Sequence, residues 1–138
     1  MNHYTFEQMS VGMTESFTDS ITENMLYTFG ELSGDKNPMH TDPDYAKNNG
    51  YCDRLVYGML SSSFFSTLVG MYLPGEYCLL LSCNSSFHNP VYVGDTLTVT
   101  GKVAQINDST RTVEIKALIT NQDGKKVVKG KILVGFTK

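Results

Sequence analysis

The chain has 138 residues, of which 41% are hydrophobic and 18% charged, and its formal net charge is −3. This length predicts one domain spanning residues 1–138, and the composition is typical of a globular protein rather than a disordered one. The negative charge argues against nucleic acid or an anionic membrane as a partner, because both attract a basic surface. One small lysine cluster is interpreted as a solvated edge strand, with a phosphate-binding patch as the alternative: Lys125, Lys126, Lys129 and Lys131.

Three cysteines are present, Cys52, Cys78 and Cys83, with no CxxC spacing, so neither a disulfide framework nor a zinc site is expected. The N-terminus lacks the basic and apolar regions of a signal peptide. The uncharged run 55–75 contains four serines and three glycines and is interpreted as a buried core helix, not a membrane span. The expected location is the cytoplasm.

The first third of the chain predicts a strand followed by a helix. Residues 15–21 alternate weakly between polar and apolar types, as strands do. The helix is expected to begin after Thr22, a good N-cap residue, and to end at Gly34, because glycine readily takes the left-handed conformation at a helix C-terminus. Its predicted apolar face consists of Met25, Leu26, Phe29 and Leu32.

Two further helices are expected before residue 75. Residues 35–40 are rich in turn-forming types and predict a loop. A short helix is expected over 43–49, because Asp42 suits the N-cap position and Pro43 the first helical position. The longest helical candidate, 58–73, is apolar on most sides, which is typical of a helix that is buried all round.

The remainder of the chain predicts strands at 78–87, 95–106, 110–121 and 126–136. Apolar residues alternate with polar ones along the last three, as in an antiparallel sheet with one buried face. We expect these four strands to form a meander, with the strand at 15–21 added to the sheet. Such a sheet would have to curve around the helix at 58–73 to cover it, which places the fold in the α+β class.

Asp35 and His40 form an acid–histidine pair five positions apart in a constrained segment. Aspartate accepts hydrogen bonds and histidine both donates and accepts, so the pair can hold one water molecule. One member can then remove a proton from the water while the other delivers one. Addition of water to a double bond next to a carbonyl, or its removal, requires this combination. Asn37 could fix the segment or add a donor.

Plainer interpretations of these residues stay open. Asp35 and Asn37 often serve only to close turns, and His40 could be a structural histidine or a helix cap. A metal site is not expected, because one aspartate and one histidine are too few ligands and neither His3 nor His88 completes a set. The chain has no GxSxG motif for a serine hydrolase, and nothing around its cysteines marks an activated nucleophile.

The segment 29–40, followed by Asp42 and Tyr45-Ala46, closely resembles the hydratase-2 motif of the MaoC-like dehydratases, which include the (R)-specific enoyl-CoA hydratases. Its core, Gly-Asp-x-Asn-Pro-x-His, is specific. The likeness covers roughly residues 7–136 and continues at 56–60, 73–75, 87–91 and 93–96.

This resemblance implies a hot-dog fold, in which an antiparallel sheet wraps the central helix at 58–73, and a homodimer or higher oligomer with sheets joined edge to edge. It implies syn hydration of a trans-2-enoyl thioester by water that Asp35 and His40 activate. The backbone N–H of Gly58 would polarise the thioester carbonyl. Ser66 matches a serine near the pair, although a packing role is an equal alternative. No cofactor is implied beyond the coenzyme A or acyl-carrier group of the substrate.

One position departs from the family pattern. The family usually has histidine before the helix glycine, whereas this chain has Tyr57, which is expected to change the shape of the substrate pocket. Two other functions are weighed. An acyl-binding module without turnover would not need both Asp35 and His40. A hot-dog thioesterase normally has an acid on or beside the central helix, and residues 55–75 contain none.

Overall fold

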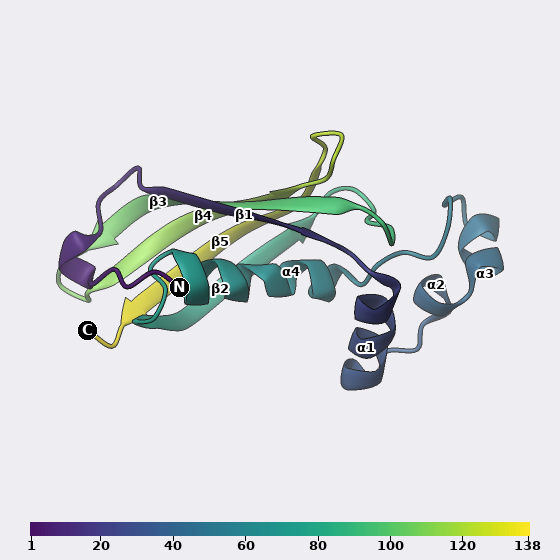
Figure 1. Ribbon diagram of the computed structural model, residues 1–138, viewed down its shortest axis with the longest axis horizontal. Coiled ribbons are helices and arrows are strands. Elements are labelled where there is room, and N and C mark those ends of the chain that lie inside the picture. The colour runs from purple at the N-terminus through teal and green to yellow at the C-terminus, as the bar shows by residue number, and fades with distance from the viewer.

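The computed structural model describes residues 1–138, and its centre is a long helix packed against a five-stranded antiparallel sheet (Figure 1). The strands are β1 (Thr14–Ser20), β2 (Cys78–Phe87), β3 (Thr96–Asn107), β4 (Thr112–Thr120) and β5 (Lys126–Phe136), in the order β1-β3-β4-β5-β2. The predicted α+β class and hot-dog fold are therefore confirmed, and all five strands lie close to their predicted ranges.

The predicted four-strand meander is wrong in one respect. Strands β3, β4 and β5 follow one another as hairpins, but β2 pairs with β5 at the far edge of the sheet instead of with β3. The connection 88–95 is no tight turn, and its eight residues are long enough to cross the sheet. For the same reason β5 is not an edge strand, so lysines such as Lys129 and Lys131 lie on the exposed face of an internal strand.

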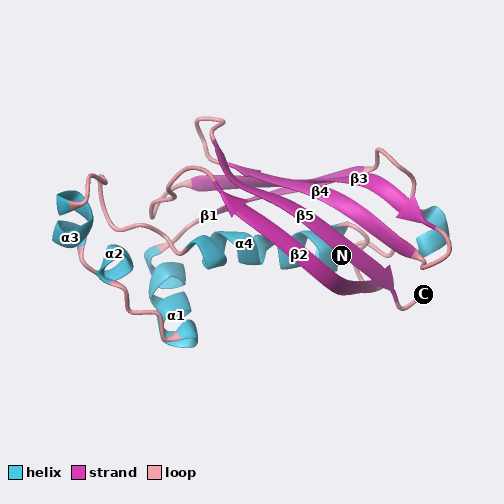
Figure 2. Ribbon diagram, turned by 180° about the vertical axis from the view of Figure 1, so that it is seen from behind, coloured by secondary structure: helices cyan, strands magenta, loops and turns pink.

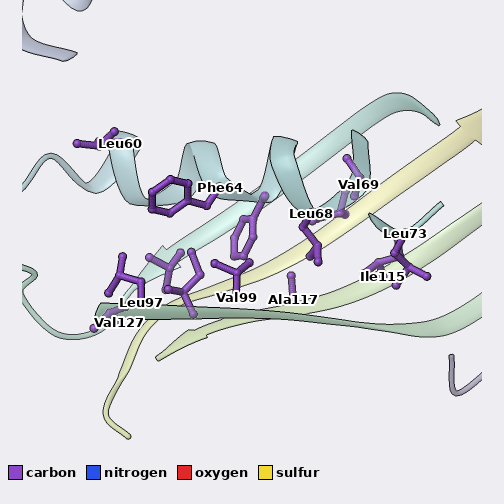
Figure 3. Packing of buried hydrophobic residues seen from close by; sticks show 14 of the residues in the cluster. Leu60, Phe64, Leu68, Val69, Leu73, Leu97, Val99, Ile115, Ala117 and Val127 are labelled. Atoms are coloured by element: carbon purple, nitrogen blue, oxygen red, sulfur yellow. The ribbon is translucent and has the colours of Figure 1, made fainter. Parts of the chain in front are cut away.

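The central helix, α4 (Gly58–Thr67), continues as a π-helical segment, Leu68–Tyr72, which together match the predicted helix over 58–73. Buried side chains of this helix such as Leu68 point toward the sheet, where Val99 of β3 and Ala117 of β4 face them (Figure 3). Two glycines allow this close approach, because a Cβ at Gly130 would lie 2.4 Å from the Phe65 ring and one at Gly101 would lie 2.8 Å from Leu68. Glycines in the sheet thus allow the helix to pack close against it.

The sequence predicted that this helix is buried on all sides, and that prediction is wrong. Met59 of α4 is 64% exposed and Met71 of the π-helical segment is 43% exposed, so other parts of the chain leave these side chains uncovered. No helix in the structure combines the length and the apolar character that a membrane crossing requires.

Three short helices lie beyond one end of α4, away from the chain termini (Figures 1 and 2). They are α1 (Glu23–Ser33), α2 (Pro38–Thr41) and α3 (Pro43–Asn48). The expected caps are present: the Thr22 side chain accepts a hydrogen bond from the Met25 N–H, and Gly34 adopts φ 77°. The expected apolar face of α1 is only partly right, because Leu32 is 82% exposed while Leu26 is buried.

Candidate active site

Asp35 lies in the short link between α1 and α2, where a network of local hydrogen bonds fixes it. Its N–H donates to Ser33 Oγ (3.2 Å), and its own Oδ1 accepts the Asn37 N–H (3.0 Å). Asn37 in turn caps α2, because its Oδ1 accepts the Met39 N–H (2.9 Å). One carboxylate oxygen of Asp35 is therefore occupied by the turn, and Oδ2 stays available. The side chain of Asn37 serves the turn, as one of the sequence interpretations expected.

His40 lies in the single turn of α2, a segment that the sequence predicted as a loop. Asn37 and Pro38 produce this turn, as N-cap and first helical residue. The His40 Nδ1 atom is 2.7 Å from the carbonyl oxygen of Leu55. Because a carbonyl only accepts, Nδ1 must carry the proton, and Nε2 of the neutral ring is left as an acceptor.

The Asp35 and His40 side chains face each other across a short gap. His40 Nε2 lies 4.0 Å from Asp35 Oδ2, too far for a direct hydrogen bond. Both atoms are acceptors when the ring is neutral and the carboxyl is ionised. A water molecule that donates one O–H to each atom would satisfy both. The structure therefore brings together the two residues that the sequence singled out, in a geometry suited to holding one water.

Tyr57 contacts both members of this pair. Its hydroxyl donates to the backbone carbonyl oxygen of Asp35 (2.7 Å), and its ring lies 4.0 Å from the His40 ring at an interplanar angle of 30°. The side chain is only 3% exposed. Burial, and secondly the negative charge of Asp35, raise the pKa of the Tyr57 phenol, so it stays a protonated donor at neutral pH.

Gly58 begins α4 directly after Tyr57. The N-cap side chain of Tyr57 makes no capping hydrogen bond, and the N–H groups of Gly58 and Met59 have no acceptor in the chain. These free donors and the helix dipole form a site for developing negative charge. A Cβ at Gly58 would lie 3.0 Å from the Phe87 ring, so glycine keeps this helix end open.

Two cavities share His40 and Gly58 as lining residues. The first, about 340 Å3, also contains Asp35 and Tyr57. The second, about 320 Å3, is lined mainly by apolar side chains, among them Val56, Phe87, Val91, Val127 and Val128. A substrate with one polar reacting group and an apolar tail therefore has space on both sides of the shared residues.

Ser66 is the one predicted site residue that the structure does not bring to this group. It is exposed on α4 and lines neither cavity. It follows Gly58 by eight positions, which is about 12 Å along a helix. No group of three or more His, Cys, Asp or Glu side chains has an arrangement that could hold a metal ion.

Three contributors to the site were not predicted from the sequence. The Leu55 carbonyl acts through the backbone, so its side-chain type gave no signal. Ser61 lines the apolar cavity, is 1% exposed, and its Oγ has no hydrogen-bond partner. Gly30 lies under the Tyr57 hydroxyl. Of these features, only Gly30 could have been noticed in the sequence, as a glycine inside a predicted helix. The sequence did not indicate which side chain packs against it.

Comparison with known proteins identifies the family of the chain. A family model described as a MaoC like domain matches residues 7–124. A protein named (R)-specific enoyl-CoA hydratase from Rhodospirillum rubrum is 35% identical over 132 residues, which cover 96% of this chain and 90% of the relative.

Two solved structures of R-hydratases superpose closely on the chain. The enzyme from Aeromonas caviae gives a TM-score of 0.90 at 31% identity, covering 94% of this chain and 98% of that one. The unliganded enzyme from Pseudomonas aeruginosa gives 0.88 at 33% identity, covering 95% and 84%. The match of the family model over most of the sequence, together with these relatives, places the chain in the MaoC-like dehydratase family.

Proposed function

We propose that this protein catalyses the (R)-specific hydration of trans-2-enoyl-CoA and the reverse dehydration of (R)-3-hydroxyacyl-CoA. The observation that carries the proposal is the pair of acceptors, Asp35 Oδ2 and His40 Nε2, 4.0 Å apart beside the free N–H groups of Gly58 and Met59. The names of the relatives, (R)-specific enoyl-CoA hydratase and 3-hydroxybutyryl-CoA dehydratase, support the same reaction in both directions.

In the hydration direction, the water held by Asp35 and His40 attacks C3 of the enoyl group. One O–H bond of the water breaks as the C3–O bond forms, and the pair accepts that proton. The pair then returns a proton to C2, which forms the C2–H bond. Because both groups would hold the same water molecule, they would act from one side of the substrate, and the two additions would take place on the same face.

During attack, electron density moves from the double bond to the thioester oxygen. The free N–H of Gly58, at the positive end of the α4 dipole, would donate a hydrogen bond to that oxygen. Such a donor acts most strongly on the charged enolate and only weakly on the neutral carbonyl, so it lowers the barrier as well as binding the substrate.

Thioester hydrolysis is the second candidate, and the structure offers it less support. Residues 58–72, which form α4 and its π-helical continuation, contain no acid that could activate a water against the carbonyl carbon. The one acid that lines the two cavities is Asp35, and it comes from the link before α2. An acyl-binding module without turnover is the third candidate, and it leaves the opposed acceptors Asp35 Oδ2 and His40 Nε2 without a role.

We also propose that the protein is a homodimer joined through β2. This strand is an unpaired sheet edge, and apolar side chains remain exposed on it and on the neighbouring side of α4: Met59, Leu79, Leu80, Leu81 and Phe87. An unpaired edge offers free backbone donors and acceptors to a second copy. Light scattering coupled to size exclusion should give twice the chain mass of 15.3 kDa, and a monomer across the micromolar range would refute this assembly.

The reaction can be tested with crotonyl-CoA by following loss of the enoyl absorbance and release of free thiol in parallel. We expect absorbance loss without thiol release. Thiol release would support the thioesterase, and binding with neither signal would support the acyl-binding module. In the reverse direction, (R)-3-hydroxybutyryl-CoA should produce the enoyl absorbance and its (S) isomer should not. Repeating the assay with the same acyl group on an acyl carrier protein shows which of the two carriers the enzyme accepts.

A further inference from the structure

Tyr57 contacts both members of the proposed catalytic pair and precedes the proposed carbonyl site in the chain. Its hydroxyl holds the main chain of Asp35, its ring lies against the His40 ring, and the next residue is Gly58. No other hydrogen bond in the chain is made to the Asp35 carbonyl oxygen. A single buried side chain thus connects the three parts of the site.

Gly30 provides the space for this side chain. A Cβ at position 30 would lie 2.5 Å from the Tyr57 hydroxyl oxygen and 3.4 Å from the ring carbon Cζ. Gly30 lies inside α1, where glycine costs about 0.5–1 kcal/mol relative to alanine. The helix carries this cost at the one place where the phenol oxygen would meet a methyl group, so Gly30 and Tyr57 are complementary in shape.

We propose that Tyr57, seated on Gly30, is the positioning residue of the site, an inference that rests on the hydratase function proposed above. Its hydroxyl holds the Asp35 backbone in place through a hydrogen bond, and its ring fixes the orientation of the His40 imidazole by packing against it. Together these contacts keep Oδ2 and Nε2 4.0 Å apart, at the separation that one water molecule spans.

The need for such a support follows from the exposure of Asp35. Its side chain is 49% exposed and belongs to a link without regular structure between α1 and α2. Local turns fix its direction, but only Tyr57 ties its backbone to the core. Since displacement of a reacting group by about 1 Å can lower a rate about 100-fold, loss of this tie should act on turnover more than on substrate binding.

The test compares four proteins: the wild type, Tyr57→Phe, Gly30→Ala and the double variant. Tyr57→Phe should lower kcat for crotonyl-CoA hydration by about 10- to 100-fold with KM changed by less than about threefold. Gly30→Ala should lower kcat similarly, because its methyl group displaces the hydroxyl. The double variant should be no slower than Tyr57→Phe alone, since the methyl then meets only Cζ at an ordinary contact distance.

Tyr27→Phe is the matched control, because it removes a phenol oxygen from an exposed position on α1. Its kcat should equal that of the wild type. Effects of Gly30→Ala and Tyr57→Phe that multiply in the double variant would overturn the pairing. An unchanged kcat in Tyr57→Phe, or a change confined to KM, would overturn the positioning role.

A second readout separates this inference from the proposed function. If the wild type hydrates no enoyl thioester, the function fails, and the amide NMR signals of residues 35–40 then report on position directly. Tyr57→Phe should shift those signals and Tyr27→Phe should leave them in place. Unshifted signals in Tyr57→Phe would refute the support whether or not the enzyme is active.

Discussion

The ring of His40 is held to the backbone of Leu55, with Nδ1 2.7 Å from the carbonyl oxygen. Leu55 belongs to the segment that leads into α4, so the chain that delivers Gly58 to the site also selects the tautomer of the histidine. Backbone N–H of Leu55 donates in return to the Met39 carbonyl (2.9 Å), which closes a two-way link between α2 and this segment. The acid–histidine pair and the helix N-terminus are therefore positioned together.

Replacing either member of the pair should abolish most of the hydration activity. Asp35→Asn retains a carbonyl oxygen that can accept the Asn37 N–H, so the turn survives while the proton acceptor is lost. His40→Gln removes the ring base. We expect kcat to fall about 100- to 10,000-fold in each, with a melting temperature close to that of the wild type. Asp44→Asn, an exposed acid on α3, is the control. Near-wild-type turnover in either variant of the pair would contradict the mechanism.

Gly58→Ala should impair the carbonyl site. The added methyl would lie 3.0 Å from the Phe87 ring and would stand where the thioester has to approach the free N–H. Alanine keeps the backbone N–H but hinders access to it, so the fall in kcat should not exceed the range of about 100- to 1,000-fold that follows complete loss of one oxyanion donor. Gly70→Ala tests the same change where nothing lies within 4 Å of the new Cβ. Equal rates for the two variants would show that Gly58 has no special role.

Gly130→Ala should destabilise the fold, and it changes no residue of the site. Its Cβ would lie 2.4 Å from the Phe65 ring, which is buried between α4 and the sheet. Overpacking of this kind lowers the free energy of unfolding by about 1–3 kcal/mol. Gly135→Ala, on the same strand, places its Cβ 3.4 Å from the side chain of Leu81 and should be tolerated. Chemical denaturation followed by circular dichroism compares the two, and equal midpoints would contradict the packing described for Phe65.

Burial raises the pKa of the Cys78 thiol to about 11, whereas Cys52 is exposed. Since only the thiolate reacts, Cys78 should be alkylated by iodoacetamide at pH 8 much more slowly than Cys52. The rate at Cys78 should keep rising as the pH approaches 11. Peptide mass spectrometry after timed labelling measures both rates, and equal labelling at early times would refute the burial of Cys78.

Local patterns predicted most of the fold because they report on local physics. The alternation of Leu97, Val99 and Val103 placed β3, and Thr22 and Gly34 marked the ends of α1. The pairing of β2 with β5 was missed because a strand pattern does not encode its neighbour. Leu32 was wrongly predicted to be buried. Helical spacing shows only that Leu32 lies on the apolar face of α1, and the packing of other elements decides which residues of that face are covered.

The site was predictable in its residue types but not in its contacts. Asp35 and His40 stood out through spacing and through resemblance, and the structure brings them within 4.0 Å. Tyr57 was expected to alter the shape of the pocket, whereas its hydroxyl also holds the backbone of Asp35. That contact depends on the space above Gly30, which is a tertiary property. Ser66 matched by position, yet its exposure on α4 depends on how much of the helix the chain itself covers.

The segment that contains α1, α2 and α3, and with them Asp35 and His40, lies beyond the end of α4 (Figure 2). Only Leu26, Gly30 and Ala46 are buried in these three helices, whereas α4, β3, β4 and β5 supply most of the core. Segments with so little burial open through local fluctuations long before global unfolding. Amide hydrogens of residues 34–50 should therefore exchange faster than those of β4, and activity should disappear at lower urea concentration than the sheet signal. A folded circular dichroism spectrum alone would then be no proof of an intact site.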